Sequence, residues 1–178
     1  SRKRCARTSC GRPDTPKHMA HPEHERRIHS DIEPFNAWRR AHPGERLDLR
    51  GADLAGILLR PVVRSVDCED GAYAEIVERW DLSAADLRQA RLTGADLGRA
   101  ILSGADLRGA DLRGAELYET DLCDARFDGA FLAGATLVDA DLRGAVFHDT
   151  NFALASASRT VSPTRRWTTL RGARCGHT

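Results

Sequence analysis

A leucine or phenylalanine occupies every fifth residue from Leu82 to Phe152, fifteen times without a break. Two residues before each of them lies a small slot, which alanine fills in twelve of the fifteen repeats and Trp80, Thr120 and Thr150 fill in the others. A five-residue step carries the leucines around the whole surface of a helix, and it places them on alternate faces of a strand. Neither element buries both positions of every repeat.

The period fits a chain that turns once per repeat, so that each pentapeptide forms one side of a coil. The small residue and the leucine then both point inward. Glycine recurs two residues after the leucine, where a corner requires permissive backbone angles. Seven glycines hold this position: Gly94, Gly104, Gly109, Gly114, Gly129, Gly134 and Gly144. Short units that cannot bury their own apolar face must stack, which predicts a solenoid.

The stretches Ala85-Asp86-Leu87, Ala95-Asp96-Leu97 and Ala140-Asp141-Leu142 share one pattern. With them the chain resembles the pentapeptide repeat family, whose repeats read A-(D/N)-L-x-x. The resemblance implies an all-β fold, a right-handed quadrilateral β-helix with four repeats per coil. Residues twenty apart then stack, which places Phe127 and Phe147 in one column.

An earlier set of repeats, residues 45–60, precedes the main β-helix of residues 81–152. The spacing between Leu59, the last leucine of the first set, and Leu82 is not a multiple of five. We therefore interpret residues 61–80 as an excursion that interrupts the coil.

Within this excursion, Tyr73, Ile76, Val77 and Trp80 follow the i, i+3, i+4, i+7 spacing of a helix. The spacing predicts a short amphipathic helix over residues 71–79, packed against the coil. Two interpretations stay open: the helix carries function, as excursions from rigid scaffolds often do, or it covers an edge of the coil.

The two ends of the chain differ from the repeats. Residues 1–29 are rich in Arg, His and Pro without periodicity, so they are predicted to be a disordered basic leader, and Met19 is an alternative start. Residues 30–44 are predicted to form a helix that caps the N-terminal end of the coil. Residues 153–178 carry five Arg/Lys and no acid, which predicts a basic and mostly disordered tail.

Composition excludes several classes of function. The chain has no phosphate-binding glycine loop, nucleophile elbow or paired Cys-x-x-Cys, so no catalytic residue and no cofactor is assigned. Five scattered cysteines do not form a disulfide framework, and no apolar run is long enough for a membrane span. We therefore expect a cytoplasmic protein that is not an enzyme.

Candidate contact residues come from the outward positions of the coil and from the excursion. The net charge of +1 conceals an acidic middle, with seven Arg/Lys against thirteen acids in residues 81–152. One outer side carries acidic residues and another mixes Asp86 and Asp106 with Arg88 and Arg108. The candidates for protein contact are Asp67, Glu69, Asp70, Asp81, Asp121, Asp124, Asp141 and Phe131.

An outward phenylalanine at Phe131 leaves three alternatives: the tail covers it, a second subunit covers it in a homodimer through the C-terminal coils, or it is an isolated surface aromatic. The general expectation is a non-catalytic protein-interaction scaffold whose partner is unknown. The family resemblance implies one alternative, a DNA mimic that binds DNA gyrase or topoisomerase IV and protects them from quinolones or toxins.

An alternative of another class is a metal-binding protein, because His18, His21 and His24 of the leader lie three residues apart. Pro22 interrupts this spacing, and no metal ligands are assigned. Direct binding of nucleic acid by the basic tails is not expected, since they lack aromatic residues for stacking apart from Trp167.

Overall fold

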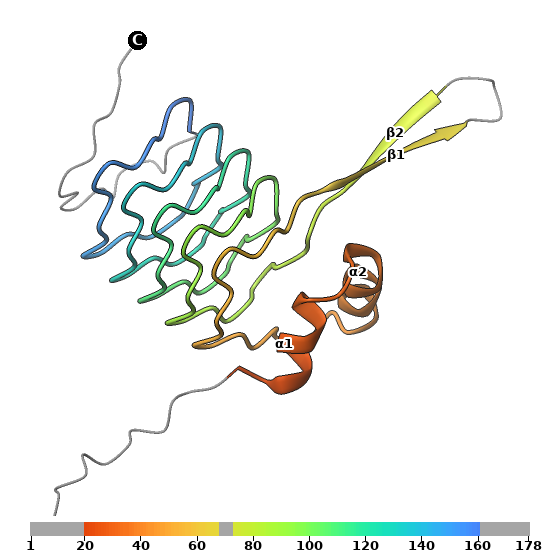
Figure 1. Ribbon diagram of the computed structural model, residues 1–178, viewed down its shortest axis with the longest axis horizontal. Helices are drawn as coiled ribbons and strands as arrows, with labels where there is room; N and C mark the ends of the chain where they lie inside the picture. Colours follow the sequence, from red (N-terminus) through yellow and green to blue (C-terminus); the bar gives the residue numbers. More distant parts are fainter. Residues whose placement is uncertain (1–19, 68–72, 161–178) are drawn as a thin grey trace, which may run out of the picture.

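The computed structural model describes residues 20–67 and 73–160. Its regular elements are α1 (Pro22–Ile28), α2 (Ile32–Ala41), β1 (Val62–Asp67) and β2 (Tyr73–Glu78). Most of the remaining chain winds into a stack of coils, with both helices at its N-terminal end. The hairpin of β1 and β2 projects away from this stack (Figure 1).

Each coil contains twenty residues and has four sides. Parallel bridges join Asp86 to Asp106 and Arg91 to Asp111, and the other two sides are joined at the same interval. Leu87 N–H donates to the carbonyl of Asp106 at 2.9 Å, and Asp106 N–H donates to that of Ala85 at 2.9 Å. The coils thus bond to each other as neighbouring strands do, which confirms the expected four repeats per coil.

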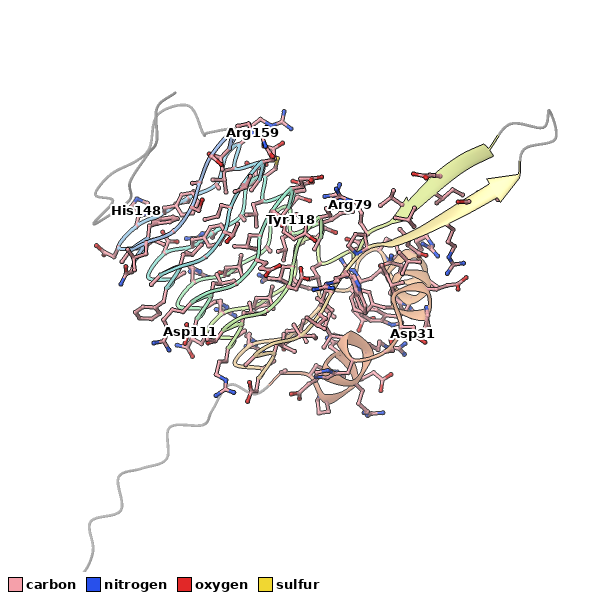
Figure 2. The ribbon with its side chains drawn as sticks, turned by 45° about the horizontal axis from the view of Figure 1, so that its top comes forward. Asp31, Arg79, Asp111, Tyr118, His148 and Arg159 are labelled. Atoms are coloured by element: carbon pink, nitrogen blue, oxygen red, sulfur yellow. The ribbon has the colours of Figure 1, made fainter. Side chains whose placement is uncertain are left out.

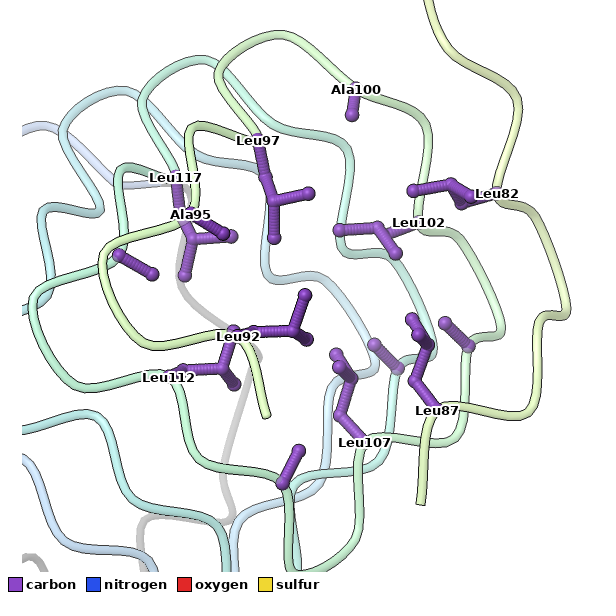
Figure 3. Packing of buried hydrophobic residues seen from close by; sticks show 14 of the residues in the cluster. Leu82, Leu87, Leu92, Ala95, Leu97, Ala100, Leu102, Leu107, Leu112 and Leu117 are labelled. Atoms are coloured by element: carbon purple, nitrogen blue, oxygen red, sulfur yellow. The ribbon is translucent and has the colours of Figure 1, made fainter. Parts of the chain in front are cut away.

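The core is a set of vertical columns of inward side chains. Leucines twenty residues apart lie one above the other inside the coil, as Leu87 and Leu107 do (Figure 3). The alanines fill the space beside them, and both kinds of residue are almost fully buried. Phe127 and Phe147 stack with their ring centroids 4.8 Å apart, as the twenty-residue interval predicts.

The corners are tight turns, and the small slots accept threonine as well as alanine. Ala105 N–H donates to the carbonyl of Leu102 at 3.0 Å, and Gly104 between them has φ +67°, which is a type II turn with glycine in its preferred place. Thr120 and Thr150 replace alanine in buried slots. Their hydroxyls donate to carbonyls of the preceding coil at 3.0 and 2.7 Å, so neither is left unsatisfied.

The expected excursion is present, but it does not break the ladder of the coil. Asp48 bridges Asp86 in parallel, and Leu58 bridges Asp96 at the same interval, which is longer than the usual twenty. The excess equals the length of the segment 61–78, which leaves the coil at one corner and returns to the same corner. The ladder is therefore continuous through the insertion.

The helix expected over residues 71–79 is wrong. The inserted segment is an antiparallel hairpin, in which Val63 pairs with Val77 and Arg64 pairs with Ile76. Both strands are rich in β-branched residues, whose side chains fit an extended backbone better than a helix. The helical spacing in this segment was therefore coincidental.

The predictions for the ends of the chain need two corrections. Residues 22–28 of the leader form α1, whose His24 accepts a hydrogen bond from Asp48 N–H at 2.9 Å and whose Ile28 is buried. At the other end the coil continues beyond Phe152, since Ser156 N–H donates to the carbonyl of Ala135 at 2.9 Å. Residues 1–19 and 161–178 lie outside the described residues.

Helix α2 lies at the N-terminal end of the coil, where a cap was expected. Phe35 is fully buried, and its ring lies 5.0 Å from that of Trp80. Arg39 donates to the carbonyls of Glu45 and Ser83 at 3.0 and 2.8 Å, which ties the helix to two segments of the first coil. These contacts cover apolar side chains that a solenoid otherwise exposes at its end.

Candidate protein-interaction site

The hairpin carries most of the exposed large apolar side chains in the described part of the chain. Five of its residues are between 37% and 55% exposed: Val62, Val63, Val66, Ile76 and Val77. Surface leucines or valines that occur singly need no explanation, but five on two six-residue strands are a concentration. They are divided between the two faces of the hairpin, with Val62, Val66 and Ile76 on one face and Val63 and Val77 on the other.

The base of the hairpin is fixed to α2 and to the coil. Asn36, which is buried, donates to the carbonyl of Arg79 at 2.8 Å and to Glu78 at 3.3 Å. Trp80 closes the insertion where it rejoins the coil, because its Nε1–H donates to the carbonyl of Arg60 at 3.2 Å. The projecting strands therefore have a defined orientation relative to the rest of the molecule (Figure 1).

The two faces of the hairpin have different surroundings. Directly paired residues share a face, so Val63 and Val77 lie on one side while Arg64 lies on the other. Arg64 forms an ion pair with Glu33 of α2 at 2.9 Å, which shows that its side is turned toward the helix. Val63 and Val77 lie on the opposite face of the hairpin.

Both outer edges of the hairpin are open. Within residues 20–67 and 73–160, β1 and β2 pair only with each other. An isolated two-stranded hairpin is marginally stable, and an open edge offers backbone N–H and C=O groups to another strand. The hairpin can therefore accept a further strand or an apolar surface.

The acidic candidates from the sequence fall in separate places. Asp67 ends β1, while Glu69 and Asp70 lie outside the described residues. Three others, Asp81, Asp121 and Asp141, lie on one side of the coil. Ile101 separates Asp81 from Asp121 on that side. Asp124 occupies the corner beside them, at φ +57°.

Phe131 bridges Asp111 and Asn151 on a different side of the coil and is 48% exposed. The sequence candidates thus do not meet in one site. Two of the acidic residues on the coil are also compensated, because Asp81 lies 4.0 Å from Arg39 and Asp141 lies 2.6 Å from Arg143.

Many carboxylates of the coil are paired with the arginine two residues later, and charged groups cover its outer sides (Figure 2). In the pair of Asp141 and Arg143, Nε–H donates to Oδ1 at 2.9 Å and Nη2–H to Oδ2 at 2.6 Å. This hydrogen bonding by arginine lowers the pKa of three of these acids below its ordinary value: Asp48, Asp111 and Asp141. The outer sides therefore carry alternating charges instead of a continuous acidic surface.

We expect acid to destabilise the coil through these pairs. Because the pKa of each carboxyl is lower in the folded protein, the stabilisation is complete above the unfolded value of about 4 and is lost as the pH falls through the folded value. The urea midpoint should be steady near neutral pH and should fall below about pH 4. In the Arg143→Gln variant the fall should be smaller, and an equal fall would contradict a role for this pair.

The one cysteine in the described part of the chain is not activated. Burial, followed by the neighbouring Asp121 and Asp141, raises the pKa of the Cys123 thiol to about 11. The thiol is therefore protonated near neutral pH, and a reactive cysteine requires the opposite shift.

In the part of the leader that the structure describes, residues 20–29, no group of metal ligands is present. Both ring nitrogens of His24 are engaged, Nδ1 with Asp48 N–H at 2.9 Å and Nε2 with Glu45 at 2.9 Å. Over residues 20–67 and 73–160, no three His, Cys, Asp or Glu side chains are grouped closely enough to hold an ion. His18 lies outside these residues.

The repeat pattern matches a family model. The model for pentapeptide repeats matches eight copies, over residues 81–117 and 115–153. A pentapeptide repeat protein from Nostoc PCC 7120 is 35% identical, with 44% of this chain and 69% of that chain covered, at a TM-score of 0.23. The chain belongs to the pentapeptide repeat family.

Two further solved structures are similar to parts of this pentapeptide repeat protein. One from the Arabidopsis thaliana thylakoid lumen is 31% identical, with 58% of this chain and 63% of that chain covered and a TM-score of 0.28. QnrB1, a plasmid-mediated fluoroquinolone resistance protein, is 20% identical, with 53% and 59% covered and a TM-score of 0.33. The chain thus spans less than two thirds of either structure. None of the curated proteins matches it.

Neither helix in the described part of the pentapeptide repeat protein is long and apolar enough to cross a membrane.

The sequence did not identify the apolar surface of the hairpin. The available signal was two runs rich in β-branched residues, Val62–Asp67 and Tyr73–Glu78, separated by a short segment that includes Gly71. Such a pattern is typical of a hairpin with a short loop. The helical spacing of Tyr73, Ile76, Val77 and Trp80 led instead to the prediction of a helix.

Proposed function

We propose that this protein is a non-catalytic protein-binding scaffold whose hairpin is the element that contacts the partner. The observation that supports this most is the concentration of exposed apolar side chains on an unpaired two-stranded sheet, held in a fixed direction by Asn36 and Trp80. A rigid coil that presents a projecting edge needs no catalytic group.

The charge of the hairpin supports a proposal about the chemistry of the partner. Residues 62–78 contain one arginine and five acids, Asp67, Glu69, Asp70, Glu75 and Glu78. The partner surface we propose is therefore an extended segment with alternating apolar and basic side chains. It adds to an edge of the sheet, and its basic residues face the acids.

Site-specific crosslinking tests this assignment. A photoreactive amino acid is placed either at Val63 on the hairpin or at Thr136 on the coil, and adducts are collected from cells of the source organism. We expect a specific adduct from position 63 that weakens as salt is raised, because exposed charges are screened. Adducts that form only from position 136 contradict the proposal.

Two variants make the result specific to the hairpin. Val63→Lys with Val77→Lys places like charge before a basic partner and should abolish the interaction without unfolding the coil, because both side chains are exposed. Phe131→Lys adds charge at an exposed apolar position on the coil and should leave it intact. If Phe131→Lys abolishes the interaction and the hairpin variant retains it, the contact surface is the side of the coil that carries Phe131.

A second candidate is binding to DNA gyrase or topoisomerase IV as a DNA mimic. The observation that favours it is the acidic composition of the projecting hairpin, and the arginines along the coil count against it. Titration into a gyrase supercoiling assay with a quinolone tests it. Protection by the wild type that is lost in Glu75→Lys supports this candidate, and absence of protection removes it.

A further inference from the structure

Three arginines form a column along one side of the coil. Arg50, Arg88 and Arg108 occupy equivalent positions in successive coils, two residues after Asp48, Asp86 and Asp106. Each arginine binds its own aspartate through Nε–H and Nη2–H, with distances between 2.6 and 2.8 Å. These two-point contacts hold the guanidinium planes in one orientation.

The charges of this column are separated by depth. The side chains of Asp86 and Asp106 are only 6% and 7% exposed, whereas those of Arg88 and Arg108 are 38% and 37% exposed. The carboxylates of Asp86 and Asp106 therefore lie beneath their guanidinium groups, whereas Asp48, at 25%, is nearly as exposed as Arg50, at 32%. Arg46 contributes a fourth cation, 3.6 Å from both buried carboxylates. Beyond Arg108 the next position of the column is the carboxylate of Asp128, so the positive charge is concentrated between Arg50 and Arg108.

A hollow of about 410 Å³ lies against these guanidinium groups. It is lined by Arg50, Arg88, Gln89, Arg108 and Gly109, and no carboxylate is among its lining residues. Within the described residues, the Nη1 groups of the three arginines have no protein acceptor. They remain available as donors to a bound group.

We propose that this hollow binds a small molecule with two or more oxyanionic groups, either phosphates or carboxylates. Successive coils are about 4.8 Å apart, so neighbouring guanidinium groups can each contact a separate anionic group of one ligand. Arginine suits both groups because its planar N–H donors match their oxygens. The amide of Gln89 supplies a neutral donor at the edge of the hollow.

The buried aspartates prepare the arginines for this role. A flexible arginine loses rotamer freedom when it binds a ligand, but these side chains are already fixed by their aspartates. The hollow is distinct from the hairpin, and the inference does not depend on the proposed protein partner.

Titration calorimetry on the full chain at low salt tests the site, with inorganic pyrophosphate and citrate as the two probes. We expect saturable binding of at least one probe, and the probe that binds assigns the site to phosphate or carboxylate ligands. Arg88→Gln with Arg108→Gln should weaken binding by about tenfold or more, because two charge-assisted contacts are removed. Absence of heat with both probes overturns the proposal.

The matched control is Arg113→Gln with Arg143→Gln. These arginines form the same two-point contacts with Asp111 and Asp141, but neither has an arginine at the equivalent position of a neighbouring coil. The control removes the same charge and should retain wild-type affinity, so equal weakening by both double variants overturns a specific site.

If the first double variant fails to fold, Arg88→Lys with Arg108→Lys replaces it. This variant keeps the charge and removes the planar donors. It should also weaken binding, and unchanged affinity would contradict recognition by the guanidinium groups.

Discussion

Replacing Leu112 with lysine should unfold the coil. Leu112 is fully buried in a central column between Leu92 and Leu132. An ammonium group at this position has no acceptor among its apolar neighbours, and burying it unpaired costs several kcal/mol, which is comparable to the whole stability of a domain. Circular dichroism at about 25 °C should show loss of the folded spectrum, and urea denaturation should lose its cooperative transition.

Leu154→Lys is the matched control for this experiment. It makes the same substitution at a leucine that is 88% exposed and occupies a corner. Its urea midpoint should stay close to that of the wild type, because an exposed lysine remains hydrated. A folded Leu112→Lys protein with wild-type stability would mean that the leucine columns are not the core.

Replacing Phe35 with alanine should destabilise the protein by about 3–5 kcal/mol, the usual cost of removing a buried phenylalanine. Its ring fills the space between Trp38 and Trp80, with centroids 6.3 and 5.0 Å away. The loss opens a cavity where α2 meets the end of the coil. Urea denaturation measures the change, and tryptophan fluorescence, to which Trp38 and Trp80 beside the cavity contribute, should report a more hydrated environment.

The control for the cap is Phe131→Ala. This phenylalanine is 48% exposed, so its removal leaves no enclosed cavity and should cost well under half as much. Equal losses at the two positions would show that α2 contributes no more to stability than a surface side chain does.

The repeats were predictable because one rule is applied at every position. Leu87 and Leu107 are inward for the same reason as every other fifth residue, and a single misread repeat could not have changed the period. The stacking of Phe127 on Phe147 follows from the same count. In the repeats the local pattern and the global fold agree, so the architecture of the coil could be predicted from the sequence alone.

The regions outside the repeats were predicted less well because their structure depends on tertiary contacts. Helix α1 is polar, and it is held by Asp48, whose backbone N–H bonds to His24. Such a contact leaves no periodic signal in the sequence. The hairpin was missed because Ile76 and Val77 fit two periods at once, and short apolar runs do not distinguish helix from strand.

The arginine column was only partly visible in the sequence. The twenty-residue interval places Arg88 and Arg108 on one side, but Arg50 joins them only when the longer interval across the insertion is known. The depth of the aspartates beneath them also could not be read from residue types. Predicting a site of this kind requires the register of the coil as well as its period.

The insertion also bears on how this protein can change in evolution. If the segment 61–78 is left out of the count, Leu59 and Leu82 have the same spacing of five as the leucines of neighbouring repeats. The hairpin is therefore a cassette that can be lengthened, exchanged or lost at one corner while the ladder on either side keeps its register. Changes within the cassette therefore need not disturb the folding of the coil.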